Sequence, residues 1–285
     1  MSVKSKIACM LKQRIHALLC SLAPLEGRAR KLLSNRRGSE TISTLIIAAT
    51  IMLVTLISAN VAEHLIELQV AQAEFEQAKE VMIILADMVE EVGSKMYSSS
   101  YVKFNCRSGM LDFLKNYTHI KVVLVTDSEN LTLIDTYTSS LRFRSGVKFS
   151  VVEEYVRGDA PSILGGEAAQ LISIYKCMDQ DGSPSIWLHS RSIRLIDEGV
   201  MYLESRGYNV NIYELIFVRV GIGLTFGSGS LNVKAYGKGV SLNTYLIENS
   251  GTVHLYLNGQ WVDSASIVAP TLLYVVTVEV EIATV

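Results

Sequence analysis

The longest uniform feature of the sequence is a stretch without charge. Residues 41–62 carry no charged side chain. A helix of this length measures about 33 Å at about 1.5 Å per residue, and the hydrocarbon core of a bilayer is about 30 Å thick. The pattern therefore predicts a membrane-spanning helix. The alternatives are a buried helix of a soluble protein and a cleaved secretory signal, whose apolar region is only about 7 to 15 residues long.

The hydrophobic pattern continues beyond this stretch with the period of a helix. Apolar side chains recur at steps of three and four on one face, at Leu65, Leu68, Ala71, Phe75, Ala78, Met82, Leu85, Val89 and Val92. Mostly acidic residues fill the other faces, and the helix is expected to end at Gly93-Ser94. These features predict one helix of about 50 residues, apolar and then amphipathic. The amphipathic stripe needs a partner, either a globular domain folded back on it or parallel copies of the helix.

After Gly93 the period changes from helical to alternating. Short runs predict strands at residues 122–125, 141–144, 147–151, 186–188, 193–196, 215–220, 231–236, 240–247, 253–257 and 272–282. Asn258-Gly259 is a hairpin-turn signal. Residues 108–117 and 165–174 are expected to be helical. The predicted fold class is α+β, a long N-terminal helix followed by a β-rich, sandwich-like globular head.

Charge is distributed unevenly along the chain. The 285 residues carry a formal net charge of −2. Residues 1–38 carry +8, and the remaining residues carry −10. A basic segment before a membrane span and an acidic one after it are typical of a chain whose N-terminus lies in the cytoplasm and whose bulk lies outside. The acidic remainder also argues against nucleic acid as a partner, since phosphates require a basic surface.

The predicted head contains two cysteines and two glycosylation sequons. Cys106 and Cys177 either form a disulfide, as in many exported domains, or remain separate thiols. Asn116 and Asn130 each begin an Asn-x-Thr sequon. Both sequons are candidates for N-glycosylation.

Catalytic motifs are sparse in the sequence. The histidines are scattered and show no metal-ligand spacing with the cysteines. Residues 179–182 resemble the start of a calcium loop but lack the later glutamate, so a plain turn is expected. Two Gly-x-Gly segments between Gly221 and Gly229 precede an alternating stretch instead of the helix that a phosphate loop requires. We therefore expect no enzyme activity, no cofactor and no metal.

The junction between the basic and apolar segments carries a family resemblance. Arg36 and Arg37 precede Gly38, a short polar segment follows, and apolar residues begin at Ile42. This order resembles the class III signal peptide and N-terminal helix of archaeal type IV pilins and archaellins. The resemblance implies that a prepilin peptidase cleaves between Gly38 and Ser39.

The same resemblance implies the division of the chain and its partners. Residues 1–38 would be a leader, residues 39–93 a helix that serves as membrane anchor and then as filament core, and residues 94–285 an extracellular head. The implied partners are further copies of the chain, the prepilin peptidase, and an assembly ATPase with its membrane platform. The residues expected to pack in the helical core are Ile42, Leu45, Ile46, Leu53, Leu56, Leu65, Leu68, Phe75, Met82 and Leu85.

The implied function is that of a structural subunit of a cell-surface filament, inserted in the cytoplasmic membrane as a precursor. Adhesion is favoured over propulsion because the predicted head is large and rich in strands. An archaellin of a motility filament is the nearest alternative, and a single-span membrane protein with an extracellular β-sandwich binding domain is another. The sequence departs from bacterial pilins at Glu40, the second residue of the implied mature chain, because those pilins typically carry a glutamate at the fifth.

Overall fold

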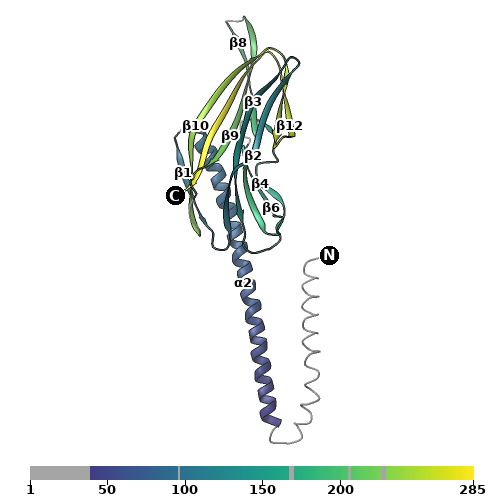
Figure 1. The fold of residues 1–285 in the computed structure, drawn as a ribbon, viewed down its shortest axis with the longest axis vertical. Helices are drawn as coiled ribbons and strands as arrows, with labels where there is room; N and C mark the ends of the chain where they lie inside the picture. Colours follow the sequence, from purple (N-terminus) through teal and green to yellow (C-terminus); the bar gives the residue numbers. More distant parts are fainter. Residues whose placement is uncertain (1–38, 96, 167–169, 205–206, 226–228) are drawn as a thin grey trace. The chain divides into compact units, whose positions relative to one another are not determined.

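The computed structural model describes residues 39–285 apart from 96, 167–169, 205–206 and 226–228. The residues before Ser39, including Arg36, Arg37 and Gly38 of the implied cleavage site, lie outside this part. One helix, α2 (Ser39–Ser94), is followed by a β-rich domain (Figure 1), which confirms the predicted α+β class. The chain divides into two compact units, of which the second is Glu67–Val285. We call this second unit, which includes the last turns of α2, the head unit.

The length of α2 follows from its composition. Residues 41–92 contain neither glycine nor proline, so nothing interrupts the 56-residue helix. Polar side chains in its apolar part bond to the helix itself, as where the Thr50 hydroxyl donates to the Ile46 carbonyl at 2.8 Å. Such bonds satisfy polar groups without water. The helix ends at Ser94, where the sequence predicts its end.

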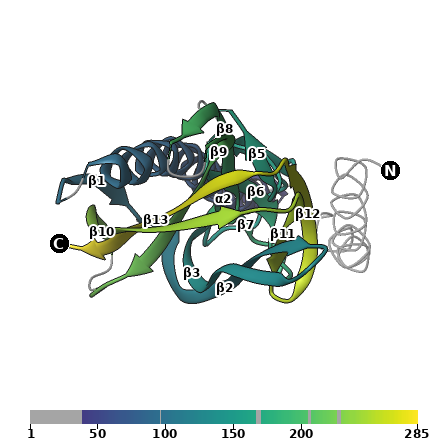
Figure 2. The ribbon, with the colours of Figure 1, turned by 90° about the horizontal axis from the view of Figure 1, so that it is seen from above.

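The strands of the described part form two mainly antiparallel sheets. The six-stranded sheet has the order β1 (Ser99–Asn105), β10 (Ser230–Ile247), β13 (Thr271–Thr284), β9 (Tyr208–Ile222), β8 (Ile193–Leu203) and β5 (Ile163–Gly165). The seven-stranded sheet has the order β12 (Gln260–Ile267), β11 (Gly251–Leu257), β2 (Met110–Thr126), β3 (Asn130–Arg144), β7 (Pro184–Ser190), β6 (Ile172–Met178) and β4 (Glu154–Arg157). Figure 2 shows β2 and β3 on one side of the head and β8 and β9 on the other.

Two buried clusters form the core of the head unit. The first joins the stripe of α2 (75–92) to side chains of both sheets, including Val278 of β13 and Phe143 of β3. The second contains strand residues from both sheets, such as Phe217 of β9 and Leu124 of β2. Of the two partners considered for the amphipathic stripe, the structure therefore shows the domain folded back on it.

The end of α2 approaches the six-stranded sheet closely at Gly237. A Cβ atom at this position would lie 3.0 Å from the carbonyl oxygen of Val92. The register of β10 shifts between Gly237 and Gly239, which marks a bulge. The bulge lies inside one long strand that includes both segments predicted separately, 231–236 and 240–247.

The hairpin turn predicted at Asn258-Gly259 is confirmed. It joins β11 to β12, and the two residues have φ angles of 50° and 80°. Two successive left-handed residues are what a two-residue hairpin turn requires, and Asn-Gly adopts them readily. The side-chain oxygen of Asn258 also accepts the N–H of His119 at 2.9 Å, which ties the turn to β2.

Three local predictions are wrong. Residues 108–117 are not helical, because β2 begins at Met110 and pairs there with Arg144 of β3. In residues 165–174, expected to be helical, β5 ends and β6 begins. Residues 147–151, expected to form a strand, lie between β3 and β4 without strand pairing, although Phe149 and Val151 pack against the first core cluster. The apolar side chains of these residues pack on the core, although their backbone does not pair with a strand.

Candidate functional site

The first part of α2 presents apolar side chains to its surroundings. Leu53 is 53% exposed and Leu56 is 66% exposed. By length and composition α2 can cross a membrane, and no residue of its most apolar window is buried within the structure. We call residues 42–62 the apolar segment. Its surface is available to lipid or to other chains.

The ten residues predicted to pack in a helical core fall into two groups. Leu45, Ile46, Leu53, Leu56 and Leu65 are exposed, and Ile42 and Leu68 are half-buried, whereas Phe75, Met82 and Leu85 are buried in the head unit. The three buried residues find their packing partners within the chain. The exposed residues can be buried only by lipid or by another molecule.

A buried carboxylate holds the amphipathic part of α2. Glu74 is 8% exposed, and its carboxylate accepts the N–H groups of Arg107 at 2.8 Å, Ser108 at 2.9 Å and Gly109 at 3.0 Å. The Ser108 hydroxyl donates a fourth bond at 2.6 Å. Successive N–H groups that converge on one anion form a concave binding site. We call this arrangement the Glu74 clamp; it joins α2 to the connection between β1 and β2.

The Glu74 clamp favours the ionised carboxylate. Burial alone would raise the pKa of Glu74, because it disfavours the charged form. The hydrogen bonds from Ser108, Gly109 and Arg107 outweigh burial, so the pKa lies below its ordinary value of 4.5. Each bond to a charged acceptor of this kind contributes about 1.5 to 3 kcal/mol.

The fold is therefore expected to weaken in acid. A carboxylate whose pKa is lowered on folding contributes stability that is complete above its unfolded pKa and is lost as the pH falls through its folded pKa. We expect the melting temperature of the full chain in detergent to decline from about pH 5 downward. The Glu74→Gln variant should start lower and decline less steeply. Parallel melting curves for the two proteins across this pH range would contradict the role assigned to Glu74.

A second clamp holds the last turns of α2. Arg157 of β4 is buried, and its Nη2 atom lies 2.9 Å from Asp87 Oδ1 and 2.9 Å from Glu90 Oε2. Glu90 Oε1 also accepts the N–H groups of Leu171 and Ile172, each at 2.8 Å. Burial would lower the pKa of Arg157, but the bonds and charges of Glu90 and Asp87 outweigh it and raise that pKa above its usual value. This Arg157 clamp joins α2 to β4 and to the start of β6.

The sequence pattern places Glu74, Asp87 and Glu90 on faces of the helix other than the apolar stripe. The structure corrects this for Glu74, which is buried, whereas Asp87 is exposed. The partners of Glu74 include N–H groups 33 to 35 residues away in the chain, which no local pattern reveals. One signal was present. Glu74 follows Ala71 by three residues and precedes Ala78 by four, so it lies on the apolar stripe itself, where a charge needs a partner.

The two cysteines of the head are separate thiols. Cys106 follows β1 of the six-stranded sheet, whereas Cys177 belongs to β6 of the seven-stranded sheet. Burial, with a smaller contribution from the charge of Glu74, raises the pKa of Cys106 to about 11. Burial also raises the pKa of Cys177, whose Sγ lies 3.4 Å from the Ser185 hydroxyl. The structure thus shows the second of the two alternatives and no disulfide between these residues.

The two sequons differ in accessibility. Asn116 lies at a bulge of β2 and Asn130 begins β3, and both residues are exposed. The hydroxyl-bearing residue of the first sequon, Thr118, is buried, whereas Thr132 of the second is exposed. Only in the second sequon are both the asparagine and the threonine accessible to a modifying enzyme that acts on the folded head.

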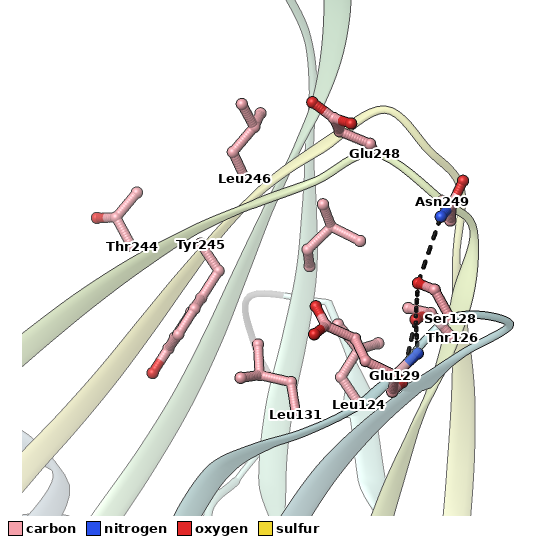
Figure 3. Close-up of a pocket in the computed structure, with 11 residues that line it drawn as sticks. Leu124, Thr126, Ser128, Glu129, Leu131, Thr244, Tyr245, Leu246, Glu248 and Asn249 are labelled. Atoms are coloured by element: carbon pink, nitrogen blue, oxygen red, sulfur yellow. Dashed lines mark hydrogen bonds between the residues drawn. The ribbon is translucent and has the colours of Figure 1, made fainter.

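An open cavity of about 460 Å³ lies between the β2–β3 turn and the end of β10 (Figure 3). The residues that line it are Leu124, Thr126, Ser128, Glu129, Leu131, Thr244, Tyr245, Leu246, Ile247, Glu248 and Asn249. The Thr126 hydroxyl donates to the Glu129 carbonyl at 3.0 Å, and the Asn249 amide donates to the Ser128 hydroxyl at 3.5 Å. These bonds brace the turn.

The sequence expectation of a plain turn at residues 179–182 is confirmed. The Gly182 N–H donates to the Asp179 carbonyl at 2.9 Å, between β6 and β7. Within the described ranges, no three His, Cys, Asp or Glu side chains lie together in a group that could hold a metal ion.

Comparison of the chain with protein-family models, curated proteins and solved structures finds no match. The candidate functional site is the apolar segment of α2, which offers an exposed apolar surface that another molecule or a lipid bilayer can bury.

Proposed function

We propose that this chain is a structural subunit of an extracellular filament of the type IV pilus kind, which polymerises through α2. One observation carries the proposal. A single unbroken helix is exposed and apolar over residues 42–62 and is then built into the head unit by the Glu74 and Arg157 clamps. A simple membrane anchor needs only the apolar segment. The clamps make the same helix a structural element of the head.

Parallel copies of the chain can cover each other's apolar segments. Moving side chains from lipid to protein gains little hydrophobic energy, so association in or from a membrane depends on close packing. The apolar segment contains small residues that permit such an approach, namely Ser43, Ala48, Ala49, Ser58 and Ala59. Its hydroxyl groups at Thr50 and Thr55 already bond to the helix backbone, so they tolerate an apolar environment.

In this proposal the basic leader keeps the N-terminus in the cytoplasm while α2 spans the membrane. A prepilin peptidase then cuts after Gly38, and an assembly ATPase with its membrane platform moves the mature chain into a fibre outside the cell. We assign the fibre to adhesion, because the large β-rich heads would form its outer surface. An archaellin of a motility filament is the alternative within the same class.

The N-terminus of the extracellular protein tests the proposal. We expect fibres sheared from cells to contain a main protein that begins at Ser39, as read by mass spectrometry. Gly38→Val should leave a membrane-bound precursor with its leader and no fibres, because the peptidase requires the small residue. Gly27→Ala, which changes another glycine of the leader, should be cleaved normally. A wild-type chain that stays in the membrane with its leader intact would overturn the filament proposal. It would favour the alternative of a single-span membrane protein with an extracellular binding domain.

A further inference from the structure

The outer face of the seven-stranded sheet carries a row of aromatic rings. Arg142 of β3 pairs directly with Trp187 of β7, which pairs with Tyr175 of β6, which pairs with Tyr155 of β4. Their neighbours in sequence Leu141, Phe143, Ile174, Ile186 and Leu188 belong to the buried core. Because side chains alternate along a strand, the aromatic row lies on the opposite face. Tyr155 is 39% exposed, and its ring centroid lies 4.8 Å from that of Tyr175.

A backbone irregularity adds a fourth ring to this row. The register of β2 shifts between Leu114 and Thr118, and Asn116 within the shift has a φ angle of 50°. Asparagine adopts the left-handed region more readily than most residues with a side chain, so it suits the turn of the chain at this bulge. The bulge places Tyr117 with its ring centroid 5.4 Å from that of Trp187, and Tyr117 remains 44% exposed. We call Tyr117, Trp187, Tyr175 and Tyr155 the aromatic platform.

Polar groups border the aromatic platform. A hollow of about 340 Å³ is lined by Tyr117, Trp187, Arg142, Arg144, Asp179, Gln180 and Asp181. The Arg142 guanidinium lies 5.0 Å from the Trp187 ring centroid and is held by Asp112 at 2.7 Å and Asp179 at 3.3 Å. Arg144 lies 3.5 Å from Asp181. The charges of these two arginines are therefore offset by neighbouring carboxylates, which leaves hydrogen-bonding capacity without a strong net charge.

We infer that the aromatic platform binds a polysaccharide through the flat faces of uncharged pyranose rings. A pyranose presents C–H groups on its faces and hydroxyl groups at its edges, so it fits aromatic rings bordered by carboxylate, amide and guanidinium groups. Rings on the adjacent strands β7, β6 and β4 extend over about 10 Å, since neighbouring strands lie about 4.8 Å apart. This length suits a chain of sugars better than a single one. The inference goes beyond the filament proposal and does not rest on it.

Binding by the full chain in detergent micelles tests the inference. The probes are insoluble cellulose, insoluble chitin and soluble xylan, with alginate as an acidic comparison. We expect binding to at least one uncharged probe, little changed by added salt. Trp187→Ala and Tyr175→Ala should each weaken it about tenfold, and Trp187→Phe should retain most of it.

The second tryptophan of the chain provides the matched control. Trp261 of β12 is 60% exposed at the far edge of the same sheet, so Trp261→Ala should bind as the wild type does. Circular dichroism and melting curves identify any variant that fails to fold. If an alanine variant does not fold, polysaccharide binding is compared between Trp187→Phe, Tyr175→Phe and the wild type instead. Binding to none of the uncharged probes would overturn the inference, as would equal loss in Trp261→Ala or binding to alginate alone that salt abolishes. Loss of self-association in Trp187→Ala with unchanged polysaccharide binding would also overturn it, in favour of a protein partner.

Discussion

Phe75→Ala is expected to destabilise the head unit by about 4 kcal/mol and to lower its melting temperature by about 10 °C. Phe75 is 1% exposed, and its ring packs edge-on against Phe149 at 5.4 Å and against Phe143 at 6.3 Å. Removing the ring leaves a cavity among side chains that are held by two sheets and cannot collapse into it. Thermal and denaturant unfolding of the full chain in detergent measure the loss.

Leu56→Ala is the matched control for this substitution. Leu56 also lies on α2, but it belongs to the exposed apolar segment, so its truncation should leave the melting temperature of the head unit unchanged. If both variants melted like the wild type, the stripe of α2 would not be part of the core of the head. If both were destabilised alike, the apolar segment would contribute to the same cooperative unit.

Leu53→Arg is expected to abolish fibres while leaving the head unit folded. Leu53 lies near the middle of the charge-free stretch. An arginine at the centre of a membrane helix costs about 2.5 to 3.5 kcal/mol in insertion. An unpaired charge buried between packed helices costs about 3 to 5 kcal/mol. Quantification of the membrane-bound precursor measures membrane insertion, and electron microscopy of sheared surface material measures fibre assembly.

The control for Leu53→Arg places the same charge elsewhere. Val152 is 71% exposed in the connection between β3 and β4, and Val152→Arg should assemble normally. Fibres of normal length and number from Leu53→Arg would show that the apolar segment is not the assembly surface. A loss of fibres with both variants would point to a general effect of added charge.

The helix was predictable because its determinants are local. A charge-free stretch followed by apolar residues at steps of three and four, with no glycine or proline, specifies a long helix whatever surrounds it. The same holds for the hairpin turn at Asn258-Gly259, where two residues define the backbone. The runs 215–220 and 272–282 likewise lie within β9 and β13.

The place of Glu74 on the apolar stripe signals that this charge needs a partner. The partners themselves, and the aromatic platform, were not predictable, because the residues that meet are distant in sequence. Glu74 meets backbone N–H groups that only the folded connection after β1 brings together. Trp187 and Tyr175 face each other through strand pairing, and Tyr117 joins them through a bulge that no residue pattern signals. The expected strand at 147–151 fails for a related reason, since its apolar alternation reflects contact with α2 through Phe149 and not sheet formation.

The spacing of the two clamps has a mechanical consequence. Glu74 and Glu90 are 16 residues apart on α2, which corresponds to about 24 Å along its axis. A tensile load applied along the helix is shared within the head unit by both clamps and by the buried stripe between them. Rupture then requires many bonds to fail at once, whereas a helix held at one point would peel away bond by bond. The head is thus built to withstand traction on the helix that carries it.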